Sequence, residues 1–281
     1  MLLLLSLLAL LLAGWLLWAN KALVLTPCSL SSPRLPEAFD GYRIAHLSDL
    51  HNRTFGPENR RLLELLEQAN PDLIVLTGDL FDSYRLNPAV ALDFVRRAQA
   101  IAPCFFVPGN HEARIASYPS LRQDLQAAGV QALENRSVSL RRAGSHLSLV
   151  GLADPGFHKR TTFPNSKAYL AAHLPHCSTQ DPYTILLSHR PEYMPFYVQS
   201  GVDLVLSGHA HGGQIRLPFV GGIFSPGQGF FPRYTSGCCQ EGQTSMVISR
   251  GLGNSSFPLR VLNRPEVVLL ELHHTSVPSL P

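Results

Sequence analysis

The chain has 281 residues, of which 45% are hydrophobic and 9% aromatic, so it can fill a sizeable core and is not a disordered protein. Charged residues make up only 15% of the chain and the net charge is +3, which is too weak a basic field to favour nucleic-acid binding. The 5 cysteines are too few for a disulfide-stapled small fold, and their odd number leaves at least one thiol free, which favours a reducing compartment.

The first segment in chain order is an apolar stretch without any charged residue over residues 1–19. A helix over residues 1–25 would be about long enough to cross the ~30 Å core of a bilayer. A cleaved signal peptide is the alternative, but no Lys or Arg precedes Lys21, and residues 19–22 form a poor cleavage site. We therefore predict a single-pass anchor over residues 1–25, in the inner membrane of the cell. Because Lys21 and Arg34 follow the anchor, the positive-inside rule favours a cytoplasmic location for the rest of the chain.

A linker is expected after the anchor, over residues 26–41, because Pro27, Pro33 and Pro36 interrupt this stretch. Cys28 lies in it and is expected to be structural or incidental. The folded domain is predicted over residues 42–273, followed by a tail over residues 274–281.

The first half of the domain alternates short apolar runs with amphipathic stretches. Strands are predicted over residues 42–48, 73–77 and 104–107, and helices over residues 58–70 and 88–102. This order indicates parallel strands that are connected by crossover helices.

The second half is richer in strands and suggests a second sheet that packs on the first. Its strands are predicted over residues 137–141, 146–152, 183–188, 203–207, 246–249 and 267–272, and its helices over residues 166–173 and 192–199.

Residue types that bind metals follow five of the predicted strands. They occur in the segments Asp49-Leu50-His51, Gly78-Asp79-Leu80-Phe81-Asp82, Gly109-Asn110-His111-Glu112, Ser188-His189 and Gly208-His209-Ala210-His211. Because the carboxyl ends of strands in an α/β sheet form a shared binding edge, we expect these side chains to converge. Mixed His, Asp and Asn ligation suits Mn²⁺, Zn²⁺ or Fe²⁺. These five segments together hold more ligand residues than a single ion can use. Centres with two metal ions are typical of hydrolases that act on phosphoesters.

The ordered set Asp-x-His, Gly-Asp-x-x-Asp, Gly-Asn-His-Glu, His and Gly-His-x-His resembles the calcineurin-like metallophosphoesterases, over about residues 42–272. Residues 208–219 and 250–254 are similar to the membrane-anchored bacterial branch, which includes phosphodiesterases and a UDP-2,3-diacylglucosamine pyrophosphatase of lipid A biosynthesis. The resemblance implies an α/β fold, a four-layer αββα sandwich, here carrying an N-terminal transmembrane helix.

The same resemblance implies a hydrolase of phosphoesters or pyrophosphates, in which a hydroxide that bridges two metal ions attacks phosphorus. A phosphodiesterase acting near the membrane is the first interpretation, and the lipid pyrophosphatase is an alternative. A metal-binding scaffold without catalysis is an alternative of another class. The expected partners are a phosphoester or nucleotide-lipid substrate and the membrane, without nucleic acid.

The resemblance also implies a role for each motif residue. Metal ligands would be Asp49, His51 and His211 for the first ion, Asn110, His189 and His209 for the second, and Asp79 for both. His111 would donate a proton to the leaving group, and Asp82 would orient the His111 ring. Glu112 is expected to support the site.

Residues 212–237 carry several phenylalanines among glycines, together with Arg216 and Arg233. Two interpretations remain open, an ordinary hairpin connection and a lipid-facing lip whose arginines bind phosphate. Arg216 and Arg250 are the candidate substrate-binding residues.

Overall fold

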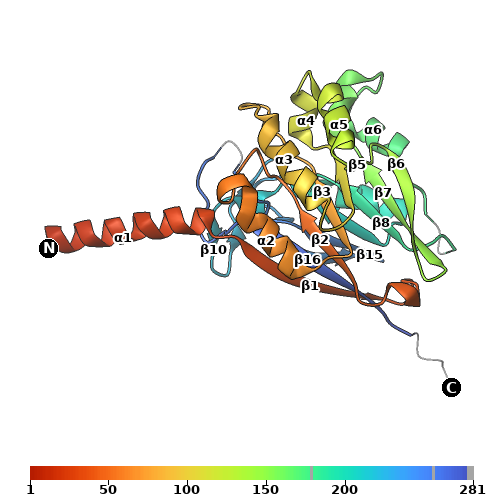
Figure 1. Ribbon diagram of the computed structural model, residues 1–281, viewed down its shortest axis with the longest axis horizontal. Helices are drawn as coiled ribbons and strands as arrows, with labels where there is room; N and C mark the ends of the chain where they lie inside the picture. Colours follow the sequence, from red (N-terminus) through yellow and green to blue (C-terminus); the bar gives the residue numbers. More distant parts are fainter. Residues whose placement is uncertain (178–179, 255–256, 277–281) are drawn as a thin grey trace.

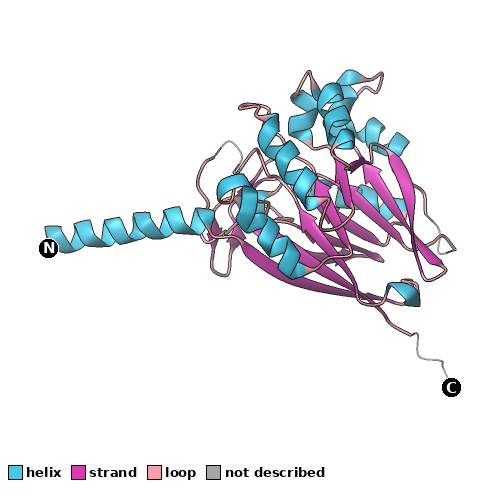
Figure 2. Cartoon of the chain, in the orientation of Figure 1, coloured by secondary structure: helices cyan, strands magenta, loops and turns pink. Residues whose placement is uncertain are grey.

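Two six-stranded sheets pack face to face in the computed structural model, which describes residues 1–177, 180–254 and 257–276 (Figure 2). The first sheet has the order β1 (Val24–Ser32), β16 (Glu266–His274), β2 (Tyr42–Leu47), β3 (Leu73–Thr77), β4 (Cys104–Val107) and β5 (Gln131–Ala132). The second has the order β14 (Gly237–Glu241), β15 (Thr244–Ile248), β9 (Leu204–Ser207), β8 (Thr184–Ser188), β7 (Ser145–Leu152) and β6 (Arg136–Arg142).

Helices cover the outer faces of both sheets. The first sheet packs against α2 (Arg60–Ala69), α3 (Pro88–Ala98) and α5 (Tyr118–Ala127), and the second against α6 (Ser166–His173) and α7 (Met194–Ser200). Side chains from both inner faces, such as Val75 and Ile185, share the central cluster. The predicted four-layer αββα sandwich is therefore confirmed.

Strands β2, β3 and β4 run parallel, as the alternation of strands and helices predicted. Helix α3 ends at Ala98, before the predicted end at residue 102. The chain turns there, and the side chain of Gln99 accepts the amide proton of Cys104 at 2.8 Å, which fixes the start of β4. Helix α5 and the short helix α4 (Asn110–Arg114) were not predicted.

The stretch that was expected as a linker instead contains β1, which pairs in parallel with β16 along its whole length. Its alternate residues are half-buried, and Cys28 and Leu30 pack against the central cluster. Pro27 is tolerated because β1 is an edge strand, where one side of the backbone needs no partner.

Cys28 also forms a disulfide with Cys238 of β14. Both β1 and β14 are edge strands, so the bond connects the two sheets at one side of the sandwich. The expected structural role of Cys28 agrees with this pairing. Cys104, Cys177 and Cys239 are free thiols.

Helix α1 (Leu2–Lys21) projects away from the sandwich, and its far end is the amino terminus (Figure 1). Residues 3–21 are long and apolar enough to cross a membrane, a test that a signal sequence would also pass. The region over residues 212–237 forms two small hairpins, β10 (Arg216–Leu217) with β11 (Gly221–Gly222) and β12 (Phe224–Ser225) with β13 (Gly229–Phe230). Of the predicted tail, residues 277–281 lie outside the described residues.

Candidate metal centre

The loops that follow β2, β3, β4, β8 and β9 meet at one edge of the sandwich and bring the motif residues together. Several of these residues have a left-handed backbone, with φ of 55° at Asp49, 53° at Asp79 and 63° at His209. This conformation is strained for residues other than glycine, and such strain is concentrated at functional sites.

Glycines allow the loops to approach each other closely. A Cβ at Gly208 would collide with the Ser48 hydroxyl and the Asp49 carboxylate, and a Cβ at Gly109 would collide with Asp79. Gly78 has a φ of 90°, which favours glycine. The packing of the ligand loops therefore depends on glycine at these three positions.

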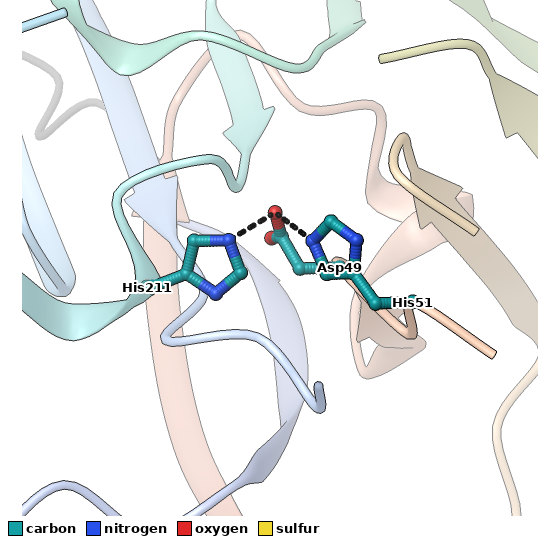
Figure 3. A group of neighbouring side chains, drawn as sticks. All are labelled: Asp49, His51 and His211. Carbon is teal, nitrogen blue, oxygen red and sulfur yellow. Dashed lines mark ion pairs between the residues drawn. The ribbon is translucent and has the colours of Figure 1, made fainter. Parts of the chain in front are cut away.

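Asp49, His51 and His211 form a first buried cluster (Figure 3). Asp49 Oδ1 lies 3.3 Å from His211 Nε2 and 3.9 Å from His51 Nε2. Both rings present a nitrogen to the same carboxylate oxygen, as Figure 3 shows.

Asp79, Asn110, His189 and His209 form a second buried cluster. His189 Nε2 lies 3.2 Å from Asp79 Oδ2, 3.2 Å from Asn110 Oδ1 and 3.2 Å from His209 Nδ1. Asp79 also reaches the first cluster, because its Oδ2 lies 3.7 Å from His51 Nε2. The structure thus brings all seven predicted ligands into one continuous site.

The side chains of the two clusters have the chemistry that is needed to bind metal cations. Asp49 Oδ1 and both ring nitrogens of His51 are buried and have no hydrogen-bond partner among the described residues, which is costly unless another group satisfies them. Burial lowers the pKa of His51 to about 4 and holds the pKa values of His209 and His211 well below the usual range. These rings are neutral at pH 7, so each offers a lone pair to a divalent ion.

His189 is paired more strongly than the other rings. Burial alone would lower its pKa, but the surrounding carboxylates of Asp79, Asp49 and Asp154 together raise the pKa to about 10. His189 Nδ1 lies 2.7 Å from the Thr77 carbonyl oxygen, which leaves Nε2 directed at Asp79 and Asn110. A cation that binds at Nε2 would therefore displace a proton from this ring.

Glu112 is completely buried beneath the site and holds two of the loops in place. Its Oε2 accepts amide protons from Asp79 at 2.9 Å and Gly109 at 2.7 Å, and its Oε1 accepts the amide proton of Phe81 at 3.0 Å. Glu112 was expected to support the site, and in the structure its carboxylate does so by accepting hydrogen bonds from three backbone amides.

His111 lies beside both clusters, with Nε2 at 3.9 Å from Asp79 Oδ2. Its Nδ1 accepts the amide proton of Ser83 at 3.0 Å, and the Ser83 hydroxyl lies 3.1 Å from the same atom. The expected orienting residue, Asp82, is 3.5 Å from Nδ1 and accepts a proton from the Tyr84 amide. Ser83, which the motif did not indicate, thus makes the shorter contacts with the His111 ring.

The two arginines that were expected to bind substrate lie elsewhere. Arg250 pairs with the buried Glu266, with Nη2 at 2.6 Å from Oε2, and Arg216 donates to the Gly212 carbonyl at 2.9 Å. Both line a cavity of about 500 Å³ that contains none of the predicted ligands. Both arginines thus line a cavity apart from the predicted ligands, and their role in substrate binding stays a prediction.

Other basic side chains lie next to the site. A cavity of about 200 Å³ contains five of the predicted site residues together with Arg114 and Arg190. A larger one of about 900 Å³ reaches His51 and Asp82 and is also lined by Arg53 and Arg85. These four arginines fall outside the motifs, so sequence spacing gave no signal for them.

Comparison with known proteins gives a consistent result. Residues 42–213 match the family model of the calcineurin-like phosphoesterases. The chain is 33% identical to "uncharacterized metallophosphoesterase YkuE" of Bacillus subtilis, over 89% of this chain and 86% of that protein. It is 32% identical to "phosphodiesterase YaeI" of Escherichia coli, over 82% of each chain. A protein of Danio rerio named "transmembrane protein with metallophosphoesterase domain" is 29% identical, over 85% of this chain and 55% of that protein.

Proposed function

Because this chain belongs to the calcineurin-like phosphoesterase family, we propose that it hydrolyses a phosphodiester close to a membrane. The family consists of metal-dependent hydrolases of phosphoesters, and this chain is one of them. The position of Asp79 carries the proposal, since its Oδ2 lies 3.7 Å from His51 in one cluster and 3.2 Å from His189 in the other. The name of the relative from Escherichia coli supports a phosphodiester as the bond that is broken.

Two divalent ions, Mn²⁺, Zn²⁺ or Fe²⁺, are the cofactors of this proposal. Asp49, His51 and His211 would hold one ion, Asn110, His189 and His209 the other, and Asp79 would contact both. Bound there, the ions would supply the positive charge that activates water and stabilises the phosphoryl oxygens.

His111 is the proton donor in this proposal. The Ser83 amide donates to Nδ1, which leaves the proton of the neutral ring on Nε2, the atom on the side of Asp79. When the ring takes up a second proton, it can give one from Nε2 to the leaving oxygen of a substrate held at the two clusters, and the ring then returns to its neutral form. The Asp82 carboxylate, 3.5 Å from Nδ1, supports positive charge on the ring.

Arg114 and Arg190 would hold the anionic substrate. Both line the cavity over Asp79 and Asn110, and Arg190 is fixed by an ion pair with the buried Asp154 at 2.6 Å. A guanidinium that is held in this way suits the oxygens of a phosphate group.

The second candidate is the UDP-2,3-diacylglucosamine pyrophosphatase activity of lipid A biosynthesis. The cavity of about 900 Å³ next to His51 favours it, since Arg53 and Arg85 could contact a nucleotide diphosphate. A catalytically silent scaffold would bind metal at the same ligands but release no product.

Product analysis after incubation with Mn²⁺ tests these alternatives. We expect the full chain to hydrolyse bis(p-nitrophenyl) phosphate, and an Asp79→Ala variant to be inactive in the same assay. Release of UMP from the nucleotide lipid, without hydrolysis of the simple diester, would support the pyrophosphatase. Absence of product from both substrates, with metal bound, would support the scaffold and contradict the proposal.

The proposed location is the cell membrane, with α1 as a single-pass anchor. Two observations oppose each other on which side the domain lies. The positive charges of Lys21 and Arg34 after the anchor favour the cytoplasm, whereas the disulfide between Cys28 and Cys238 is typical of an oxidising compartment. Alkylation of these two thiols in intact cells, before and after reduction, decides between the two sides.

A further inference from the structure

The two small hairpins carry a group of exposed apolar side chains. Strand β10 of the first hairpin lies next to the carboxyl end of α1 (Figure 1). We call this group the hairpin patch, and it consists of Leu217, Phe219, Val220, Phe224, Phe230 and Phe231. Phe219 is fully exposed, and Phe230 and Phe231 are exposed to 73% and 70%. Soluble surfaces rarely present so many neighbouring aromatic rings to water unless something covers them.

The backbone at two of these rings is strained. Phe219 has a φ of 64° and Phe231 a φ of 52°, in the left-handed region that bulky residues avoid. Neither side chain is buried in the core, so packing within the sandwich does not compensate for this strain. The strain is therefore consistent with a contact outside the chain.

A short network fixes the patch relative to α1. The side chain of Asn20, in the last turn of α1, accepts the amide proton of Arg260 at 2.8 Å and donates to its carbonyl at 2.9 Å. The next residue, Val261, forms a bridge with Ile215, which directly precedes β10. The end of the helix and the hairpins consequently occupy one end of the molecule.

Basic side chains also lie at this end, and one of them, Arg233, pairs with Glu241, with Nη2 at 2.6 Å from Oε1. The sequence has no acidic residue between Asp203 and Glu241, whereas Arg216 and Arg233 lie in that stretch. Beside the helix, the Arg264 guanidinium lies 5.2 Å from the ring centre of Trp18. Aromatic rings with cations beside them are typical of the boundary between lipid headgroups and acyl chains.

We infer that the hairpin patch inserts into the lipid bilayer beside α1, as a second membrane contact of this protein. The hairpin patch would lie at the boundary between the lipid headgroups and the acyl chains, in the leaflet next to Lys21. The inference depends on α1 lying in the membrane and is independent of the substrate and of catalysis. Of the two interpretations of residues 212–237 that the sequence allowed, this inference favours the lipid-facing one.

Depth-dependent fluorescence quenching tests this contact in the full chain. The only tryptophans are Trp15 and Trp18, so a variant with both replaced by Phe provides a silent background. Into it we would introduce Phe219→Trp or, as a matched control, His146→Trp on the exposed β6–β7 hairpin, far from α1 in Figure 1. Both proteins are reconstituted into vesicles of phosphatidylcholine and phosphatidylglycerol, with or without bromine on the acyl chains.

Brominated lipid is expected to reduce the emission of the Phe219→Trp protein about twofold, because its ring would lie ~5–10 Å below the surface. The His146→Trp protein should be unaffected. Equal emission changes for the two proteins would overturn the inference. The inference would also be overturned if another protein chain, and not lipid, covered the introduced indole and shielded it from quenching. If the background variant fails to insert, the comparison is made with Trp15 and Trp18 retained, since they contribute equally to both proteins.

Discussion

The carboxylate of Glu112 accepts the amide proton of Asp79 at 2.9 Å, directly beneath the aspartate that lies between the two ligand clusters. Three backbone amides depend on this one buried side chain, because Gly109 and Phe81 also donate to it. The carboxylate therefore determines where Asp79 sits.

Replacing Glu112 with Gln should weaken metal binding and lower stability. The amide of Gln would place a donor against backbone donors, at a cost of about 1–3 kcal/mol in the free energy of unfolding. Isothermal titration with Mn²⁺ and chemical denaturation would measure both effects. Glu64→Gln is the matched control, because Glu64 lies in an exposed pair with Arg60. Unchanged metal affinity in Glu112→Gln would show that Asp79 is positioned by other contacts.

The role of His111 can be tested with substrates that differ in their leaving group. His111→Ala should reduce kcat/KM for an alkyl phosphodiester by about 10²–10⁴-fold, because an alkoxide must be protonated as it departs. A p-nitrophenyl ester should be affected much less, since its leaving group needs little protonation. Equal losses for the two esters would argue that His111 has no part in proton transfer.

Acid stability should depend on His46, which is buried and whose Nε2 lies 2.8 Å from the Thr77 hydroxyl. Burial lowers the pKa of His46 from 6.5 to about 3. As the pH falls below 6.5, the unfolded chain binds a proton that the folded chain excludes, and stability falls by about 1.4 kcal/mol per pH unit.

His46→Gln should keep the contact with Thr77 but remove this titration. Unfolding free energies between pH 6.5 and 4, measured in EDTA so that metal release does not contribute, should then fall less steeply than in the wild type. Parallel pH profiles for the two proteins would refute the assignment.

The end of α1 should be fixed by Asn20, which makes two hydrogen bonds with the backbone of Arg260. Asn20→Ala leaves these buried groups without partners and should cost about 1–3 kcal/mol of stability in detergent micelles. Lys21→Ala, at an exposed neighbouring position, should change little. Equal stabilities for both variants would mean that the helix end is held by other residues.

Sequence patterns alone were sufficient to predict those strands that are determined by their own residues. Strands β3 and β4 are short, fully buried runs, and their ends coincide with the motifs that supply Asp79 and Asn110. The convergence of these ends follows from parallel pairing, so the seven ligands could be anticipated.

Features that depend on distant contacts could not be anticipated in this way. Strand β1 contains Pro27 and several serines, and only its pairing with β16 at the sheet edge makes it a strand. Ser83 contacts His111 because two loops meet in three dimensions, and Arg250 pairs with Glu266 of β16 in a cavity apart from the ligands. No spacing in the sequence records these contacts.

Metal stoichiometry in purified protein tests the shared role of Asp79 most directly. After loading with Mn²⁺ and removal of free ion, elemental analysis should find two ions per wild-type chain, about one in Asn110→Ala, and almost none in Asp79→Ala. Circular dichroism would establish that the variants remain folded. A wild-type chain that binds a single ion, or a folded Asp79→Ala chain that retains two, would contradict a centre in which one carboxylate serves both clusters.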